Sequence, residues 1–126
     1  MKPTILIIED NEQNMYMLSY LLTSDSYNVL KAYNGVDGLK LAHDHHPGII
    51  LIDIQLPDMD GYEICSKLRN NGLPKHTVMI AVTSYALGGD KEKALEAGAN
   101  GYIEKPINPD TFVNQMEAIY KKRIKI

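Results

Sequence analysis

The chain has 126 residues, of which 44% are hydrophobic and 23% are charged, and its formal net charge at pH 7 is -3. This length suits one domain with a real core, so we expect a single domain over residues 1–126 with no output domain. The mild acidity argues against a nucleic-acid or membrane-surface protein, which would need a clustered basic face, and no apolar run approaches membrane-spanning length. The single cysteine, Cys65, rules out an internal disulfide and suits a reducing compartment, so we expect a cytoplasmic protein.

The first part of the chain predicts two units of a strand followed by a helix. The apolar run 4–8 predicts a buried strand that ends in the acidic loop Glu9-Asp10-Asn11-Glu12. From Asn14 the spacing becomes helical, and the apolar face carries Met15, Leu18 and Leu22. A second strand is predicted over 27–32. Asn34-Gly35 then begins a helix rather than a hairpin, because the next apolar residues have helical spacing: Val36, Leu39 and Ala42.

The middle of the chain contains its most apolar strand. Residues 49–52 are four aliphatic residues, and Asp53 stands where they end, ahead of a Pro- and Gly-containing turn. In an open α/β sheet this carboxyl edge is where ligands bind, so Asp53 is a candidate site residue, the alternative being a turn or helix cap. The preceding cluster His43-Asp44-His45-His46-Pro47-Gly48 could suggest a metal site, but a solvated helix end is favoured.

The second half continues the alternation of strands and helices. A helix is predicted over 61–70 with Tyr62, Cys65 and Leu68 inward, which makes Cys65 a buried apolar residue rather than a nucleophile. The remaining predicted elements are a strand over 78–83, a charged helix over 91–97 that we expect to move, a short strand at Tyr102-Ile103 and a last helix beginning at Asn108-Pro109-Asp110. The basic end of that helix, 121–125, is expected to be a solvated C-terminus rather than a phosphate site. About five such units favour a mostly parallel sheet with helices on both faces.

In such a fold the loops after the strands open on the same edge of the sheet. They would bring together three acids, two hydroxyls and a lysine: Glu9, Asp10, Asp53, Thr83, Ser84 and Lys105. Crowded carboxylates repel one another unless a cation lies among them, and oxygen ligands with room for water suit Mg²⁺. A hydroxyl and an ammonium beside them suit a phosphoryl group on that metal, and a carboxylate between metal and lysine can become an acyl phosphate.

From Thr4 to Tyr120 the chain resembles the receiver domain of bacterial two-component response regulators, the CheY-like family. The matching segments are Ile-Ile-Glu9-Asp10-Asn11, Leu-Ile-Asp53-Ile-Gln-Leu-Pro57-Asp-Met-Asp60-Gly61, Ala-Val-Thr83-Ser84 and Gly98-Ala-Asn-Gly-Tyr102-Ile-Glu-Lys105-Pro106. The resemblance implies a three-layer flavodoxin-like α/β fold, with a five-stranded parallel sheet in the order 2-1-3-4-5. The chain is most similar to stand-alone receivers of the DivK type and to the receiver modules of hybrid kinases.

The resemblance also implies which residues bind the phosphoryl group and the metal. Asp53 is the expected acceptor, and Mg²⁺, or Mn²⁺ in its place, is expected on Asp10, Asp53 and the backbone carbonyl of Gln55. Glu9 would bind the ion directly or through water. Lys105 is expected to hold a phosphoryl oxygen.

Further roles are implied for residues around the acceptor. Thr83 is expected to bond a phosphoryl oxygen and to move toward it, while Tyr102 rotates inward as the switch aromatic. A cis bond is expected before Pro106. Gln55 and Tyr85 are expected to tune the lifetime of the phosphorylated state, in a direction that the sequence leaves open.

The resemblance implies a signalling protein that catalyses only its own phosphorylation and dephosphorylation, and so not a classical enzyme. Its expected donor is a sensor histidine kinase or a histidine phosphotransfer protein, and its output is a protein target, with neither nucleic acid nor membrane as partner. We expect a monomer or weak dimer. Met17, Tyr20 and Leu21 either dock the donor or belong to the edge of the core.

Three other interpretations fit the residues less well. An aspartate-nucleophile phosphatase would want a second acid where Gln55 stands. A flavodoxin would bind phosphate in the loop after the first strand, and Glu9-Asp10-Asn11-Glu12 would repel it. A calcium loop at Asp58-Met59-Asp60-Gly61 would need ligands where Leu56 and Lys67 stand.

Overall fold

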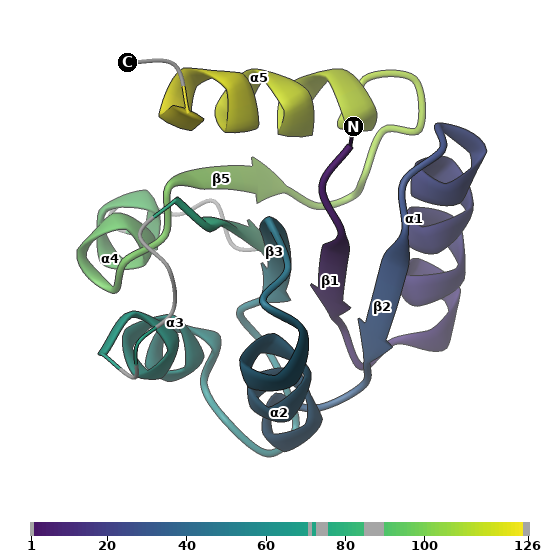
Figure 1. Cartoon of the computed structure of the whole chain (residues 1–126). Helices are drawn as coiled ribbons and strands as arrows, with labels where there is room; N and C mark the ends of the chain where they lie inside the picture. The colour runs from purple at the N-terminus through teal and green to yellow at the C-terminus, as the bar shows by residue number, and fades with distance from the viewer. Residues whose placement is uncertain (1, 71, 73–75, 85–89, 125–126) are drawn as a thin grey trace.

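The computed structural model describes residues 2–70, 72, 76–84 and 90–124. Strands and helices alternate along the chain (Figure 1). The strands are β1 (Ile5–Ile8), β2 (Val29–Ala32), β3 (Ile49–Asp53), β4 (Val78–Thr83) and β5 (Gly101–Glu104). The helices are α1 (Glu12–Ser24), α2 (Gly35–His45), α3 (Gly61–Asn70), α4 (Asp90–Glu96) and α5 (Phe112–Ile124).

The strands form one parallel sheet in the order β2-β1-β3-β4-β5. Every residue of β1, β3 and β4 is buried, because these strands have a neighbour on each side and helices on both faces. This double burial is why they consist of continuous apolar runs rather than alternating ones. The predicted fold class, a flavodoxin-like α/β sheet in the order 2-1-3-4-5, is confirmed.

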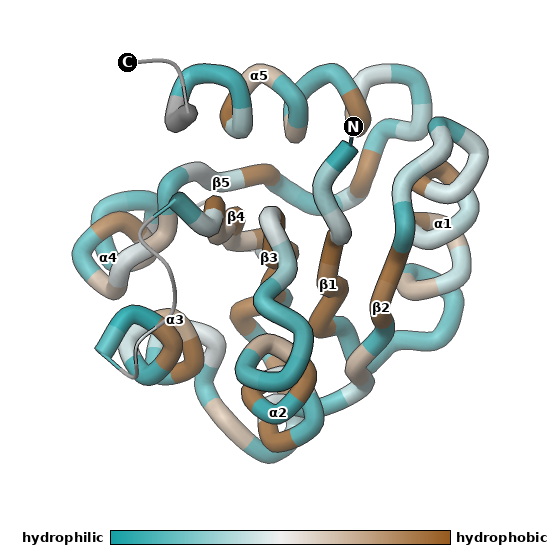
Figure 2. Tube along the Cα trace, viewed as in Figure 1, coloured by the Kyte–Doolittle hydropathy of each residue, from teal (hydrophilic) through white to brown (hydrophobic). Residues whose placement is uncertain are grey.

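The sheet separates two apolar cores. Helices α1 and α5 cover one face, and α2, α3 and α4 cover the other (Figure 1). Side chains of a strand alternate between the two cores, so Ile5 and Ile7 meet α1 and α5 while Leu6 and Ile8 meet the opposite helices. Figure 2 shows the hydrophobic residues along the strands and the hydrophilic ones on the outer sides of the helices. The strands are thus held rigidly, and their ends can serve as fixed points for a site.

Helix α2 packs through glycine, which corrects one expectation. Its buried residues are Gly35, Gly38 and Ala42, and a Cβ atom on Gly38 would come within 2.5 Å of Ile8 Cδ1. The helix therefore lies closer to the sheet than a helix with a larger residue there. Val36, expected on the apolar face, is 60% exposed, because the buried stripe passes through Gly35 and lies about 100° around the helix from Val36.

The element boundaries follow local capping. Gly35 begins α2 as predicted, and the side chain of Asn34 accepts from the Asp37 N–H. Helix α1 begins at Glu12, two residues earlier than expected, since Asn11 caps it by accepting from the Asn14 N–H. The last helix was expected from Asn108. Instead Asn108 opens a turn, in which its carbonyl accepts from the Phe112 N–H, and α5 is assigned from Phe112.

Two other details differ from the predicted strands and helices. Strand β2 begins at Val29, and the buried Tyr27 before it donates its hydroxyl to Glu117 Oε2 at 2.6 Å. In α3, Cys65 and Leu68 are buried as expected, but Tyr62 is only half-buried and Ile64 takes the inward position. Among the described residues no helix combines the length and the apolar character needed to cross a membrane.

Candidate functional site

The candidate site lies at the C-terminal edge of the parallel strands. Glu9 follows β1, Asp53 is the last residue of β3, Thr83 is the last residue of β4, and Lys105 follows β5. Register explains their proximity, since β3 and β4 pair Asp53 with Val82, while β4 and β5 pair Thr83 with Glu104. Four segments that are distant in the sequence therefore end side by side, as the alternation of strands and helices predicted.

Three carboxylates gather at this edge. Glu9, Asp10 and Asp53 each offer one oxygen atom, and these atoms all lie within 4.8 Å of one another. Glu9 is 1% exposed and Asp53 4% exposed, whereas Asp10 is open to solvent. The three carboxylates thus form an acidic pocket in which Glu9 and Asp53 are buried and Asp10 is accessible to water.

Lys105 is the cation that the protein itself supplies to this pocket. Its Nζ lies 2.8 Å from Glu9 Oε1 and 3.3 Å from Asp53 Oδ2, and its side chain is 15% exposed. Burial by itself would lower the pKa of Lys105, but the contacts with Glu9 and Asp53 outweigh burial and raise it. Lys105 therefore stays charged and balances one of the negative charges.

Glu9 is buried, and two groups of the protein contact its carboxylate. Its Oε2 accepts from the Asn11 N–H at 3.1 Å, and its Oε1 lies 2.8 Å from Lys105 Nζ, with no further partner among the described residues. Burial raises the pKa of Glu9 to about 7, and the neighbouring Asp53 adds to the rise, against the opposing effects of Lys105 and the Asn11 N–H. A lone ammonium does not fully compensate the buried carboxylates.

These acids could hold a hard divalent cation. Carboxylate oxygens are the ligands that Mg²⁺ prefers, and such an ion usually keeps several waters, which the exposed side at Asp10 would admit. Among the described residues, Glu9, Asp10 and Asp53 form the one group of three metal-ligating side chains, and the histidines at the end of α2 are exposed.

The loop from β3 to α3 holds the backbone of Gln55 beside the acceptor candidate. The Gln55 N–H donates to Asp53 Oδ1 at 3.0 Å, and Gln55 forms an antiparallel bridge with Asp60. The loop closes tightly at Gly61, where a Cβ atom would come within 2.4 Å of the Ile54 Cα. Only glycine fits there without displacing the backbone.

Asp58, in the same loop, has a structural role that the sequence analysis missed. Its two carboxylate oxygens accept from the Gly35 N–H at 2.8 Å and the Val36 N–H at 3.1 Å, at the N-terminus of α2. The Gly35 N–H bond, as the main cause, lowers the pKa of Asp58. A sequence cue for this cap is weak, because the helix it caps begins 23 residues earlier.

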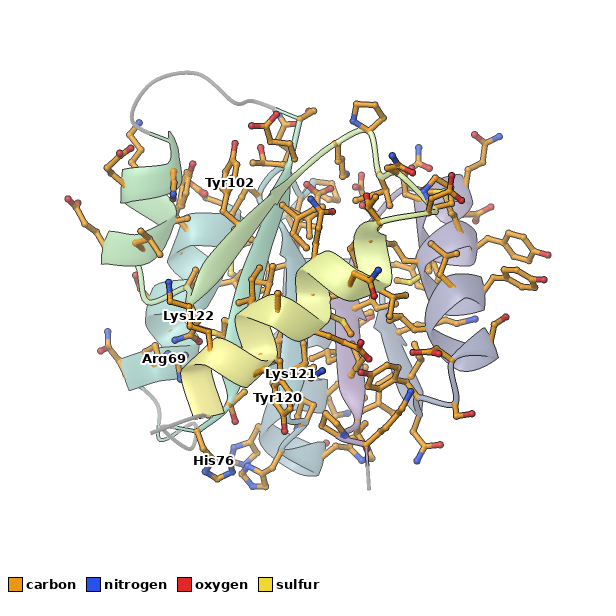
Figure 3. All side chains as sticks on the ribbon, turned by 90° about the horizontal axis from the view of Figure 1, so that it is seen from above. Arg69, His76, Tyr102, Tyr120, Lys121 and Lys122 are labelled. Atoms are coloured by element: carbon orange, nitrogen blue, oxygen red, sulfur yellow. The ribbon has the colours of Figure 1, made fainter. Side chains whose placement is uncertain are left out.

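The other predicted site residues lie around the pocket. Thr83 is buried at the end of β4, and Tyr102 lies half-buried on β5 beside α4 (Figure 3). The peptide bond between Lys105 and Pro106 is cis. Tyr85, expected to tune the lifetime of the phosphorylated state, lies outside the described residues, as do 86–89 of the same loop.

Other groups considered in the sequence do not join the site. Cys65 is fully buried, and burial raises the pKa of its thiol to about 12, as suits an apolar core residue. Figure 3 shows Tyr120, Lys121 and His76 toward the end of the molecule opposite the C-terminal ends of the strands. Ser84, by contrast, does belong to the rim, where its Oγ donates to Gln55 Oε1 at 3.1 Å.

Comparison with known proteins gives one consistent result. The family model of the response regulator receiver domain matches residues 5–117. The polar-differentiation response regulator DivK of Brucella ovis is 36% identical over 118 residues, covering 94% of this chain and 96% of that protein.

Solved structures agree. A CheY-like receiver domain protein from Methanospirillum hungatei has a TM-score of 0.89 at 30% identity, covering 99% of this chain and 98% of that one. The receiver domain of a sensor histidine kinase from Pseudomonas aeruginosa, solved with a magnesium ion in its active site cleft, has a TM-score of 0.84 at 30% identity, with full coverage of both chains. On fold, acidic pocket and sequence together, this chain belongs to the family of response regulator receiver domains.

Proposed function

We propose that this chain is a phosphorylation-dependent switch of a two-component phosphorelay, in which Asp53 accepts a phosphoryl group from a phosphohistidine. The observation that carries the proposal is the contact of Lys105 Nζ with both Glu9 and Asp53 in a buried acidic pocket. An ammonium beside an ionised acceptor is suited to bind an anionic phosphoryl group as it arrives. As in the family generally, this is a signalling role rather than that of a classical enzyme.

In the proposed transfer, a carboxylate oxygen of Asp53 attacks the phosphorus atom of the donor. The bond between phosphorus and the donor's imidazole nitrogen breaks, and its electron pair goes to the imidazole, which takes up a proton. Lys105 binds one oxygen of the transferred group and the hydroxyl of Thr83 another, which balances the charge brought to the strand ends. The product is an acyl phosphate on Asp53.

The proposed metal ligands are Glu9, Asp10, Asp53 and the backbone carbonyl of Gln55, with Mg²⁺ as the expected ion and Mn²⁺ as a substitute. The support is the close set of oxygen ligands, the burial of Glu9 and Asp53, and the magnesium ion in the related receiver from Pseudomonas aeruginosa. When bound, the ion supplies positive charge opposite the phosphoryl oxygens. Glu9 binds it directly or through water.

Output is proposed to pass through the side of the molecule formed by α4, β5 and α5. Thr83 moves toward the phosphoryl group, and Tyr102 turns inward as it does so. The support is their placement on adjoining strands, since β4 and β5 pair Thr83 with Glu104, two residues after Tyr102. A downstream protein would then bind the altered surface.

The proposed donor is a sensor histidine kinase or a histidine phosphotransfer protein, which docks on α1. Tyr16 and Tyr20 on this helix are 71% and 60% exposed, and their rings stack with centroids 6.3 Å apart. Helix α1 begins at Glu12, two residues after Asp10, so the helix that carries this aromatic surface starts at the edge of the pocket. If Tyr20→Glu leaves phosphotransfer from every cognate donor unchanged, docking on this surface is wrong. The proposed location is cytoplasmic, and the free Cys65 is consistent with a reducing compartment. The proposed state is a monomer or weak dimer.

The decisive experiment is incubation with acetyl phosphate and Mg²⁺, followed by intact mass measurement. We expect one phosphoryl group, labile in alkali, that is absent with Asp53→Asn and absent when the metal is chelated. Asp60→Asn is the matched control, because Asp60 is exposed in the same loop and an asparagine can still accept from the Tyr62 N–H. This control should be phosphorylated like the parent protein.

Two results would contradict the proposal. Phosphorylation of the Asp53→Asn variant to the same extent would place the acceptor elsewhere. Steady turnover of many phosphomonoesters would instead indicate an aspartate-nucleophile phosphatase, although Gln55 stands where that class has its general acid.

A further inference from the structure

Two side chains meet beside the acidic pocket, at the ends of neighbouring strands. Ser84 Oγ donates a hydrogen bond to Gln55 Oε1 at 3.1 Å, and both side chains are exposed. Gln55 follows β3 by two residues and Ser84 follows β4 directly. Since β3 and β4 are neighbours in the sheet, this bond joins the two strand ends that carry Asp53 and Thr83.

The backbone on each side of this bond is fixed. The Gln55 N–H donates to Asp53 Oδ1 at 3.0 Å, and the backbone of Gln55 forms an antiparallel β-bridge with Asp60. On the other strand, the Thr83 carbonyl next to Ser84 accepts from the Lys105 N–H at 2.8 Å. The freedom that remains lies in the long side chain of Gln55, whose rotamers the serine hydroxyl restricts.

We propose that Ser84 is a positioning residue that prolongs the phosphorylated state, because it holds the side-chain amide of Gln55, two residues after Asp53, where that amide restricts the approach of water to the phosphoryl group. The inference rests on the proposed function, in which Asp53 carries the phosphoryl group. It also gives the direction of the effect, since loss of the serine hydroxyl shortens the lifetime.

The chemistry concerned is hydrolysis of the acyl phosphate. A water oxygen forms a bond to phosphorus, and the bond between phosphorus and the Asp53 oxygen breaks with its electron pair returned to the carboxylate. The proton of the water passes to phosphate or solvent, so the products are the aspartate and inorganic phosphate. With Ser84 bonded to its oxygen, the Gln55 amide is held in one position, where it obstructs the water, and its oxygen is less free to accept a hydrogen bond from that water. Without Ser84, the amide is free to turn, so it obstructs the water less and its oxygen can accept a hydrogen bond that orients the water for attack. Both changes favour hydrolysis.

The test measures loss of the phosphoryl group after acetyl phosphate is removed, in the full chain with Mg²⁺. Ser84→Ala should decay about three- to tenfold faster than the parent protein, the range that one neutral hydrogen bond corresponds to. Ser84→Thr keeps a hydroxyl and should restore a decay close to that of the parent protein. In a Gln55→Ala background, Ser84→Ala should have no further effect, because the amide it positions is gone. If Ser84 contributed only to folding, neither the restored decay of Ser84→Thr nor the loss of the Ser84→Ala effect in the Gln55→Ala background would be expected.

Each result is decisive. Decay of Ser84→Ala that is unchanged or slower, or equally accelerated in the Gln55→Ala background, would overturn the inference and leave Asp53 as acceptor. Failure of Ser84→Thr to slow the decay relative to Ser84→Ala would also overturn it. If the parent protein takes up no phosphoryl group at all, the proposed function fails, and this inference fails with it. If the parent protein is phosphorylated but the decay rates differ from those expected, only this inference fails.

Discussion

Glu9 and Asp58 stand in loops at the same edge of the sheet, and the protein shifts their pKa values in opposite directions. Glu9 is buried next to Asp53, and burial raises its pKa to about 7. Asp58 is exposed, and the pKa of its carboxyl is lowered chiefly by the N–H of Gly35. Asp58 therefore caps the N-terminus of α2 and is stabilised in its charged form. The charged form of Glu9 is destabilised by burial, and a bound cation would stabilise it.

The comparison teaches that acidity alone does not identify a site in this protein. An acid paired with backbone N–H groups is structurally satisfied and needs no ligand. An acid buried among other acids costs stability unless something positive joins it, and such costs are typical of functional positions. Three variants of charged residues at this edge can test the contrast.

The largest effect is expected from Lys105→Ala in protein free of metal. The substitution removes the ammonium that lies 2.8 Å from Glu9 and 3.3 Å from Asp53, so the two buried carboxylates lose their internal counter-charge. We expect the free energy of unfolding at pH 8 to fall by about 3 kcal/mol, as for one partner removed from a buried ion pair. Chemical denaturation measures it.

The matched control for this variant is Lys67→Ala. Lys67 pairs with Glu63 at 3.3 Å on the surface of α3, where both side chains are about half exposed. Loss of a surface pair of this kind should change the free energy of unfolding by less than about 0.5 kcal/mol. If the two lysine variants lower the free energy of unfolding equally, Lys105 contributes no more to stability in the acidic pocket than Lys67 does on the surface.

A smaller effect is expected from Glu9→Gln, and it should depend on pH. Because the folded state raises the pKa of Glu9 from 4.5 to about 7, the folded protein binds more protons than the unfolded chain in that window. Stability of the metal-free parent should therefore fall as pH rises from 4.5 to 7, and level off above it. Glu9→Gln lacks this ionisation and should be more stable than the parent at pH 8, by about 1–2 kcal/mol.

Adding Mg²⁺ to the same stability measurements gives a second test of Glu9. Saturating Mg²⁺ should stabilise the parent protein more at pH 8 than at pH 5, because the acids must be ionised to bind it. Glu9→Gln should gain less from the ion than the parent does. A Glu9→Gln variant with the same pH profile as the parent, with and without Mg²⁺, would show that the raised pKa of Glu9 is not a property of the folded protein.

The smallest effect is expected from Asp58→Asn. The folded state lowers the pKa of Asp58, so the charged group contributes stability above its ordinary pKa of 3.8 and loses it as pH falls below that value. The melting temperature of the variant should be slightly lower than that of the parent at pH 7, and the difference should shrink as pH falls below 3.8. Phosphorylation of Asp53 should persist. A loss of Mg²⁺-dependent stabilisation in this variant would contradict the structural role of Asp58.

Much of the architecture could be predicted from periodicity. The strands 49–53 and 78–83 and the helix 61–70 have the expected bounds, because continuous aliphatic runs and clear turn residues mark them. The order of strands came from the resemblance to receiver domains rather than from composition. Val36 was placed on the wrong face, because the sequence does not show that α2 approaches the sheet through glycine.

The site was predicted as a set of residue types at one edge, and the structure brings Glu9, Asp10, Asp53 and Lys105 together there. The cap that Asp58 forms on α2 and the hydrogen bond from Ser84 to Gln55 were missed. Each depends on a partner more than 20 residues away, and nothing in the local pattern of either residue points to that partner.

By itself the sequence determined which segments are strands and helices, and that their ends carry acids, hydroxyls and a lysine, since hydrophobic spacing and motif order are properties of the chain. Only the tertiary structure decided that Glu9 is buried beside Asp53 and Lys105, that Asp58 caps another helix, and that Ser84 donates a hydrogen bond to Gln55. The physical reason is that pKa values and hydrogen bonds depend on distances and on exclusion of water. Both arise only when strands and loops distant in the chain pack together.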